Sequence, residues 1–188
     1  MLYLYFKRFL DIIFAITVIF FLLPIYIIIS FAIFLQDGNS FIFKQKRIGQ
    51  FGKEFSFYKF RTMPINTPDV VSIKKDEIEI TFFGKFLRRF NLDELPQFFN
   101  VLIGDMSVMG PRPSLISQIN LIELRKKNGS INIRPGITGW AQVNSYDNMP
   151  ETEKAHYDGE YYNELSLYLD IKIFFKTLMY FTKKPPTY

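Results

Sequence analysis

The chain has 188 residues, which is enough for one domain and an appendage. A hydrophobic fraction of 48% and a charged fraction of 22% exclude intrinsic disorder as the main state. The absence of cysteine excludes a disulfide scaffold, a cysteine nucleophile, a thiolate zinc site and an iron–sulfur cluster. One histidine, His156, is too few for a multi-histidine metal site, and we expect it at the surface or in packing. The net charge of +5 suits phosphates or an anionic membrane face.

An uncharged run of 24 residues, Ile12–Leu35, lies near the start of the chain. As a helix it would be roughly 36 Å long, whereas the hydrocarbon core of a bilayer is about 30 Å thick, so a tilted helix could cross it. A secretory signal peptide is disfavoured because the run is too long and no small-residue cleavage site follows it. We therefore expect this segment to lie in the membrane.

Pro24 and the flanking charges bear on whether the segment crosses. The proline removes a backbone donor in mid-helix and clashes with the preceding turn. Lys7 and Arg8 precede the run, and four more basic residues follow it: Lys44, Lys46, Arg47 and Lys53. Basic flanks at both ends favour placing both ends on the cytoplasmic side. We therefore favour a re-entrant helix broken at Pro24, with a Pro-kinked single span as the alternative.

The rest of the chain predicts an α+β fold that is mainly helical, with a small β-hairpin around residues 48–52. Residues 64–80 are polar and contain proline, so we expect a surface excursion with little regular structure. Apolar periodicity or capping signals predict helices in 81–90, 91–104, 114–127 and 151–181, separated by a rigid loop at 109–113 and by the turn-rich stretch 134–143. We divide the chain into a membrane unit, 1–36, and a globular domain, 37–188.

Adjacent carboxylates at Asp93 and Glu94 stand at a predicted helix start, directly after two arginines. Free backbone N–H groups and the helix dipole favour anions at that position, so both acids could approach one phosphate. A carboxylate can also attack phosphorus and form an acyl-phosphate intermediate. Helix capping is the structural alternative. A glycosidase is disfavoured, because it needs its two carboxylates several ångströms apart across a sugar.

Basic residues are the other candidates for chemistry. Arg112 stands between two prolines, which reduces the cost of holding its guanidinium against a phosphate. Lys59 and Arg61 could grip phosphates or could form the outer face of a strand. We assign Trp140 and Met109 to the core. The sequence has no Gly-rich phosphate-binding loop of the common types.

Three ordered motifs carry a resemblance to a known family. LDELPQFFNVLIGDMSVMGPRP at 92–113 resembles the core signature of the bacterial sugar transferases, the monotopic phosphoglycosyl transferases. KFRTM at 59–63 and RPGITGWAQVN at 134–144 resemble its flanking motifs, in the right order. KRFLDIIFA, followed by the proline-broken apolar run, is similar to its re-entrant membrane helix. The resemblance covers the chain from about residue 5 to 180.

The resemblance implies transfer of a phosphosugar from a UDP-sugar to undecaprenyl phosphate, with release of UMP. Asp93 would be the covalent nucleophile and Glu94 its acidic partner, and the two together would hold Mg²⁺. Phosphate or nucleotide binding is implied for five further residues: Arg88, Arg112, Lys59, Arg61 and Asp158. The implied active site is cytosolic and is surrounded by amphipathic interface helices.

The donor sugar, the location and the partners follow as expectations. We lean to an N-acetylated amino sugar, because this short form lacks the extra membrane spans of larger hexose-type relatives; a UDP-hexose and a non-catalytic, membrane-anchored anion-binding module are the alternatives. The implied location is the cytoplasmic face of the bacterial inner membrane, in the first membrane step of surface glycan synthesis. Membrane phospholipid and later glycosyltransferases of the same pathway are expected partners, and nucleic acid is not.

Overall fold

The expected mainly helical fold with a small sheet is confirmed in the computed structural model, which describes residues 2–38, 40–64, 80–145 and 149–181. Most of the excursion expected at 64–80 lies outside the described residues. In chain order the elements are α1 (Leu2–Asp37), β1 (Ile42–Ile48), β2 (Glu54–Phe60), α2 (Phe82–Arg89), α3 (Gln97–Ile103), β3 (Ser107–Met109), β4 (Ser114–Leu115), α4 (Ile119–Asn128), β5 (Gly136–Thr138), α5 (Trp140–Val143), α6 (Glu151–Asn163) and α7 (Leu167–Phe181).

The predicted β-hairpin is present and supplies two strands of a three-stranded sheet, in which β1 is the central strand. β1 and β2 pair antiparallel from Ile42↔Phe60 to Ile48↔Glu54, and the Gly49 N–H donates to the Lys53 carbonyl at 2.8 Å to close the turn. β4 pairs with the other edge of β1, so the strand order is β2-β1-β4. The helix expected at 114–127 therefore begins later, at Ile119, because the first residues of that segment belong to β4.

A second, parallel pair of strands was not predicted. Ser107 of β3 pairs with Gly136 of β5, and Met109 pairs with Thr138. A Cβ atom at Gly136 would lie 2.1 Å from the Gly110 nitrogen, so only glycine permits this approach of the two backbones. The turn residues around Gly136, which the sequence analysis read as a loop, thus include a short strand.

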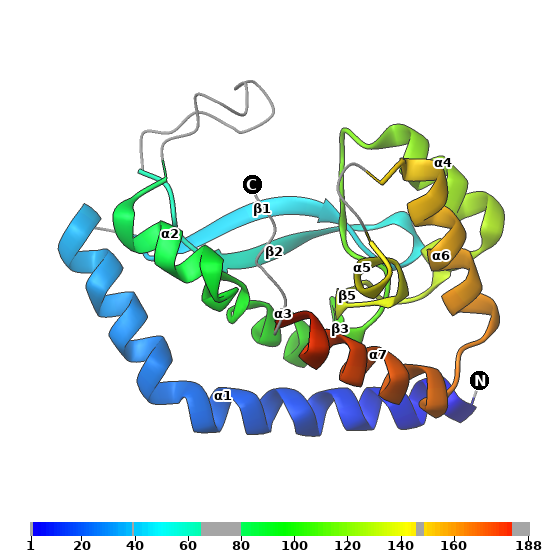
Figure 1. The fold of residues 1–188 in the computed structure, drawn as a ribbon, viewed down its shortest axis with the longest axis horizontal. Helices are drawn as coiled ribbons and strands as arrows, with labels where there is room; N and C mark the ends of the chain where they lie inside the picture. The colour runs from blue at the N-terminus through cyan, green and yellow to red at the C-terminus, as the bar shows by residue number, and fades with distance from the viewer. Residues whose placement is uncertain (1, 39, 65–79, 146–148, 182–188) are drawn as a thin grey trace.

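The long helix α1 is continuous through Pro24, so the break predicted there is a bend. Figure 1 shows the helix dividing into two legs, the first running beneath α7 and the second rising past α2. A proline is the usual cause of a sharp bend, because it removes one backbone hydrogen bond and crowds the preceding turn. Of the helices in the described residues, α1 is the one long and apolar enough to cross a membrane.

Polar contacts fix the first leg of α1 to the rest of the molecule. The Asp11 carboxylate accepts hydrogen bonds from the Ser107 hydroxyl at 2.8 Å and from the Val108 N–H at 3.0 Å, both in β3. The Arg8 guanidinium donates to the carbonyls of Val101 and Leu102 at the end of α3. Arg8, which the sequence analysis treated as a topology signal, therefore also binds carbonyls in the last turn of α3.

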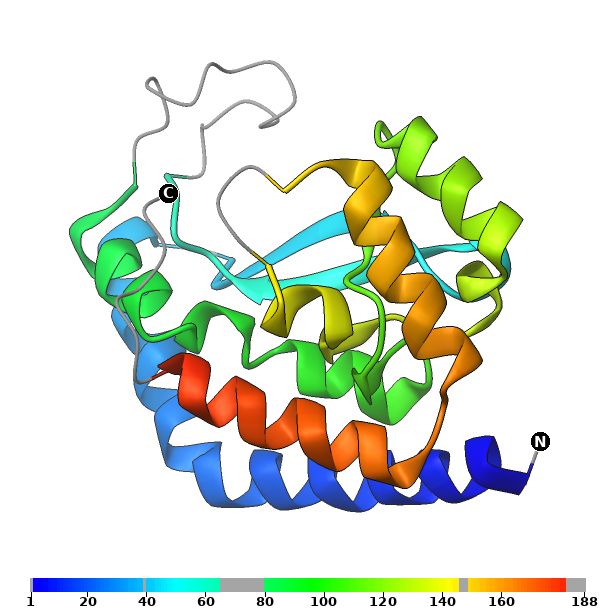
Figure 2. The same ribbon diagram turned by 45° about the vertical axis from the view of Figure 1, so that its right-hand side comes forward.

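Asp170 of α7 collects three donors at the start of α1. It pairs with the Lys7 ammonium at 2.6 Å and accepts from the hydroxyls of Tyr3 and Tyr161, also at 2.6 Å. Burial and the Asp170 charge raise the pKa of Tyr161 well above its usual value, so this phenol stays neutral and donates. In Figures 1 and 2, α7 accordingly lies along the first leg of α1.

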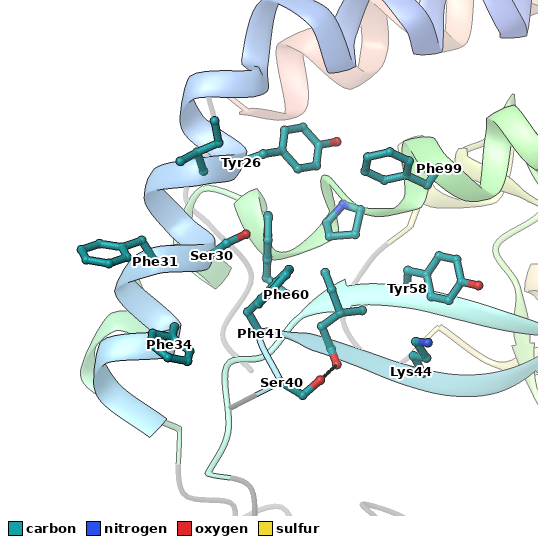
Figure 3. Close-up of a pocket in the computed structure, with 13 residues that line it drawn as sticks. Tyr26, Ser30, Phe31, Phe34, Ser40, Phe41, Lys44, Tyr58, Phe60 and Phe99 are labelled. Carbon is teal, nitrogen blue, oxygen red and sulfur yellow. Dashed lines mark hydrogen bonds between the residues drawn. The ribbon is translucent and has the colours of Figure 1, made fainter. Parts of the chain in front are cut away.

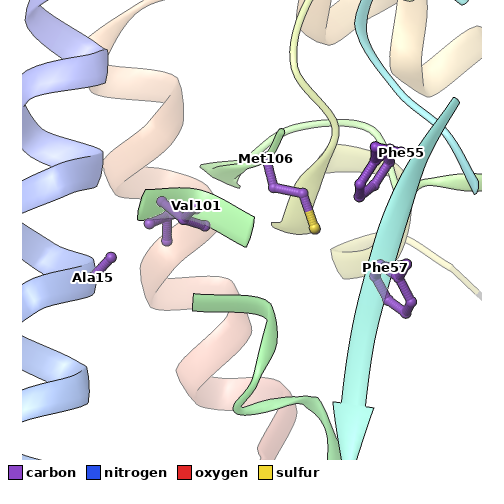
Figure 4. Close-up of a cluster of buried hydrophobic side chains, with 6 residues drawn as sticks. Ala15, Phe55, Phe57, Val101 and Met106 are labelled. Carbon is purple, nitrogen blue, oxygen red and sulfur yellow. The ribbon is translucent and has the colours of Figure 1, made fainter. Parts of the chain in front are cut away.

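Two apolar cores lie on either side of the bend. The first joins the first leg of α1 to β2 and α3 through Ala15, Phe55, Phe57, Val101 and Met106 (Figure 4). The second joins the second leg to the hairpin and α2 through Tyr26, Ile29, Ile33, Phe60 and Leu87. Both legs are therefore packed against the globular domain along one side, while their other sides carry exposed apolar residues such as Phe20 and Phe21, 71% and 72% exposed.

The helix α7 also has two environments. Leu169 and Ile173 are buried with Tyr161 in a third core, whereas Tyr168, Phe175 and other apolar residues of α7 are exposed. One face of α7 is therefore packed in the core, whereas other positions of the helix present apolar side chains at the surface.

We predict that Asp170→Ala lowers the free energy of unfolding by about 3–5 kcal/mol, because it leaves Lys7 as a buried charge without its partner. Chemical denaturation of the detergent-solubilised chain measures the effect. Glu123→Ala is the matched control, since the Glu123–Lys126 pair lies on the exposed face of α4 and should contribute little. Equal denaturation midpoints for the two variants would contradict the prediction.

Candidate functional site

The acid pair lies in a 3₁₀ turn, Leu92–Glu94, that connects α2 to α3. Asn91, just before it, has φ 54°, a left-handed conformation that asparagine tolerates better than most residues. The N-cap of α3 is Pro96, so Asp93 does not cap that helix. The carboxylate of Asp93 is nevertheless withdrawn from solvent, with the residue 5% exposed, and needs partners of opposite charge.

Lys59 and Arg112 supply those charges. The Lys59 ammonium lies 3.3 Å from Asp93 Oδ2 and 2.7 Å from Glu94 Oε1. The Arg112 guanidinium lies 2.7 Å from the same Glu94 oxygen. Burial raises the pKa of Glu94, but the nearby Arg112 and Lys59 charges outweigh burial and hold the pKa well below its usual range. Glu94 is therefore ionised at neutral pH, and the pair is bound by two cations.

Strand geometry places Lys59. It lies on the same face of β2 as Phe55 and Phe57, because side chains two residues apart in a strand share a face. Its ammonium lies 5.8 Å from the centre of the Phe57 ring, within cation–π range. The strand that contributes to the first core thus ends with a lysine directed at the acid pair. Lys59 thus lies in a strand, and its ammonium contacts the two carboxylates. A phosphate-binding role for Lys59 stays a prediction.

A hydrogen bond to its backbone carbonyl fixes Arg112 in place, in addition to the two flanking prolines. The guanidinium of Arg125, on α4, donates to the Arg112 carbonyl at 3.0 Å. Arg125 is in turn paired with Asp158 of α6 at 2.7 Å, and Asp158 is 1% exposed. The predicted site residue Asp158 thus lies behind the site, in a buried ion pair that supports the Arg112 loop.

The other two predicted cations make different contacts. The Arg88 guanidinium, in the last turn of α2, donates to the Thr62 hydroxyl at 3.0 Å. The Arg61 guanidinium donates to the Ser40 carbonyl at 2.8 Å, near the open end of the hairpin. Lys59 and Arg112 therefore form ion pairs with the acid pair, whereas Arg88 and Arg61 donate hydrogen bonds to neighbouring polar groups.

His156 and Trp140 behave largely as the sequence suggested. His156 is on the exposed side of α6, 3.2 Å from Glu160. Trp140 packs against the third core, although its indole N–H donates to Glu160 and the ammonium groups of Lys172 and Lys176 lie over its ring. Met109 packs against two of the cores.

Glu94 and Arg112 stand at a cavity of about 520 Å³, called here the acid-pair cavity. Its walls come from α1, α3, β3, β5 and α7, and most of the lining is apolar, including Phe14, Phe98, Phe174 and Leu178. An apolar chain with an anionic end group suits such a lining.

A separate apolar groove of about 870 Å³ lies between the second leg of α1, the hairpin and α3. Figure 3 shows Tyr26, Phe60 and Phe99 facing one another around it, with Lys44 farther along the hairpin. Neither the cavity nor the groove could be predicted from local sequence patterns, because each is formed by elements distant in the chain.

Comparison with known proteins assigns the family. Residues 2–184 match the model described as bacterial sugar transferase. The chain belongs to the bacterial sugar transferase family. It is 41% identical over 187 residues to the UDP-glucose:undecaprenyl-phosphate glucose-1-phosphate transferase of Klebsiella pneumoniae, covering 92% of this chain and 39% of that protein.

Two further relatives extend the comparison. An uncharacterized sugar transferase of Bacillus subtilis is 40% identical over 139 residues, covering 74% of this chain and 68% of that protein. The UDP-N-acetylgalactosamine-undecaprenyl-phosphate N-acetylgalactosaminephosphotransferase of Aeromonas hydrophila is 35% identical over 184 residues, covering 94% of this chain and 44% of that protein. This bacterial sugar transferase thus spans less than half the length of the two relatives whose names state a substrate.

Several residues that shape the site were missed at the sequence level. Arg47 lies beside Arg112, and burial together with the Arg112 charge lowers the pKa of Arg47 to about 10. Arg125 and Asp11 fix the loop and the strand that border the acid-pair cavity. Each lies in an ordinary helix or strand pattern, so no local signal set it apart.

Proposed function

We propose that this bacterial sugar transferase moves a sugar-1-phosphate from a UDP-sugar to undecaprenyl phosphate and releases UMP. The observation that carries the proposal is the acid pair, which is bound by Lys59 and Arg112 and whose Glu94 lines a mostly apolar cavity. The substrate names of two relatives support it. An anion-binding module without catalysis would have use for the two cations but not for a buried pair of carboxylates.

Asp93 is the proposed nucleophile. One of its carboxylate oxygens forms a bond to the sugar-bearing phosphorus of the donor, while the bond from that phosphorus to the bridging oxygen breaks and UMP leaves with the electron pair. A phosphate oxygen of undecaprenyl phosphate then attacks the same phosphorus and displaces Asp93, giving the diphosphosugar lipid. No net proton transfer is needed. Lys59 reduces the repulsion between the carboxylates and the incoming phosphates.

We propose Mg²⁺ as the cofactor, held by Asp93 and Glu94. The described residues contain no cluster of three or more metal-binding side chains, but Mg²⁺ is commonly bound by one or two carboxylates together with substrate phosphates. The oxygen-only donor set of the acid pair fits that preference. When bound, the ion would offset the negative charge of the diphosphate. Arg112 and Arg88 remain proposed phosphate or nucleotide ligands, and Arg61 a more distant one.

The membrane placement is also part of the proposal. Both legs of α1 have exposed apolar sides that suit contact with lipid. Phe82 and Phe86 of α2, and Phe90 just after it, are exposed apolar residues that suit it as well. A bent helix whose two legs pack on one domain suits re-entry, because both ends then stay on the domain's side. We place the domain on the cytoplasmic face of the inner membrane, where the head group of a polyprenol phosphate could reach the acid pair.

Measuring UMP release from a set of UDP-sugars tests the proposed reaction directly. Full-length chain in detergent, supplied with undecaprenyl phosphate and Mg²⁺, should release UMP from one class of UDP-sugar. An N-acetylated amino sugar is our first choice, and a hexose, as named for the Klebsiella pneumoniae relative, is the alternative. No UMP from any donor, with protein shown to be folded, would overturn the proposed reaction and favour the binding module.

We predict that Asp93→Asn lowers turnover by more than about 10⁴-fold, as loss of a covalent nucleophile does in other enzymes. The variant should still fractionate with membranes, because Asp93 takes no part in the contacts of α1. Asp105→Asn, which removes a carboxylate at the other end of α3, is the matched control. Full activity of Asp93→Asn, or failure to trap a phosphosugar on Asp93 in the wild type by mass spectrometry, would refute the covalent route.

The absence of cysteine makes the topology testable by single substitutions. We expect Leu2→Cys and Ser40→Cys, at opposite ends of α1, to react with an impermeant maleimide from the cytoplasmic side only. Lys126→Cys, on the exposed face of α4, marks the side of the globular domain. Labelling of the two ends from opposite sides would show a spanning helix instead of a re-entrant one.

A further inference from the structure

Asn100 links the helix that follows the acid pair to the strand that carries Lys59. It lies in the middle of α3 and is fully buried. Its side-chain amide donates to the Ser56 carbonyl at 2.7 Å and accepts from the Tyr58 N–H at 3.1 Å, and both of these groups belong to β2. The proposed reaction as argued so far makes no use of this contact.

The two hydrogen bonds satisfy an edge of the sheet that would otherwise be open. In the strand order β2-β1-β4, β2 has a neighbouring strand on one side only. Alternate residues of an antiparallel strand direct their N–H and C=O groups away from the partner strand. Ser56 and Tyr58 are two residues apart on that outer edge of β2. The Asn100 amide therefore bonds them as the backbone of another strand would.

Bonds to two particular backbone groups fix how α3 lies along β2. Val101 of α3 and Phe57 of β2 also meet in the first core (Figure 4). Hydrophobic contact is non-directional, however, whereas a hydrogen bond requires both a distance and an angle. Within the described part of the chain, the side-chain hydrogen bonds between α3 and β2 are those of Asn100. Asn100 therefore sets the register between the two elements.

Both sides of this link lead directly to the acid pair. Tyr58 is followed by Lys59, whose ammonium lies 2.7 Å from Glu94 and 3.3 Å from Asp93. On the other side, α3 begins at Gln97, three residues after Glu94. A shift of α3 along β2 would move the acids relative to the lysine, and a charge-assisted hydrogen bond of this length needs both groups in place.

We propose that Asn100 is a positioning residue for the transferase reaction, whose amide fixes β2 against α3 and so holds the Lys59 ammonium at the acid pair. This inference rests on the proposed function. Asn100 and Lys59 are both absent from the lining of the acid-pair cavity. The effect of Asn100 is therefore on the phosphoryl-transfer steps, in which Lys59 offsets negative charge, and not on the binding of the lipid chain.

A double-mutant cycle in turnover, with the full-length chain in detergent, tests the inference. Asn100→Ala should lower kcat about 10–100-fold, as the loss of an orienting partner does at other sites. The KM for undecaprenyl phosphate should stay unchanged. Lys59→Met should lower kcat about 100–1,000-fold, as the loss of a charge-stabilising group does. Because Asn100 acts through Lys59, adding Asn100→Ala to Lys59→Met should lower kcat by less than about twofold more. Losses that multiply in the double variant would overturn the proposal.

Asn128→Ala is the matched control. The Asn128 amide also bonds to backbone groups, donating to the Ala155 carbonyl at 2.6 Å and accepting from the Ser130 N–H at 3.0 Å, but it joins α4 to α6. Its removal should leave kcat per folded molecule within about twofold of the wild type. A loss of kcat equal to that of Asn100→Ala would show a general loosening of the fold and would overturn the positioning role.

Chemical denaturation gives a readout that does not depend on turnover. Lys59→Met should lower the denaturation midpoint less in the Asn100→Ala background than in the wild type, because the ion pair is already displaced there. If Asn100→Ala does not fold, Asn100→Asp, which keeps the acceptor for the Tyr58 N–H, replaces it in both cycles.

The two readouts also separate this inference from the proposed function. Coupled midpoint shifts, with no turnover of any donor by the folded wild type, would support the positioning of Lys59 and refute the transferase reaction. UMP release by the wild type, with independent midpoint shifts and kcat losses that multiply, would refute the role of Asn100 and leave the reaction standing.

Discussion

Two adjacent carboxylates withdrawn from solvent are unstable unless cations are brought to them, and much of this structure serves that requirement. Lys59 reaches Asp93 and Glu94 from the end of β2, and Arg112 reaches Glu94 from a loop between two prolines. The hairpin gives the lysine its direction, and the Arg125–Asp158 pair supports the loop from behind. The acids, lysine and arginine come from segments that only the folded chain brings together. A phosphate entering the site would find its repulsion by the acids already reduced.

The same electrostatic reasoning explains how the long apolar helix α1 is joined to the elements around the acid-pair cavity. Charged residues are costly on a lipid-facing helix. Three of those in α1, Lys7, Arg8 and Asp11, lie in its first turns and make polar contacts with the rest of the protein. Asp11 accepts from two groups of β3, and Lys7 pairs with Asp170 of α7. β3 and α7 both contribute walls to the acid-pair cavity. The first leg of α1 and the acid-pair cavity are therefore fixed relative to each other by polar contacts on the protein-facing side of the helix.

Arg112 stands in a wall shared by two cavities. The mostly apolar acid-pair cavity and a smaller cavity of about 320 Å³ lined by basic residues share Arg112 and Gln142. Relatives of this chain are named for glucose and for N-acetylgalactosamine, so membership of the family does not by itself fix the donor sugar.

The sequence by itself determined the features that depend on near neighbours. Alternating side chains and a glycine turn indicated the hairpin, apolar periodicity indicated α2, Gly104 marked the end of α3, and the LDELPQFF motif identified the family and the acid pair. Tertiary structure alone decided the rest. Asp158 pairs with a residue 33 positions away and Asp170 with one 163 positions away, so no local pattern could reveal that both are buried supports. The parallel pairing of β3 with β5 and the acid-pair cavity likewise arise from segments far apart in sequence. Pro24 bends the helix without ending it, because cores on both legs hold the turns on either side of it. Periodicity reports which face of an element is apolar, whereas only packing decides what that face, or a charge beside it, will meet.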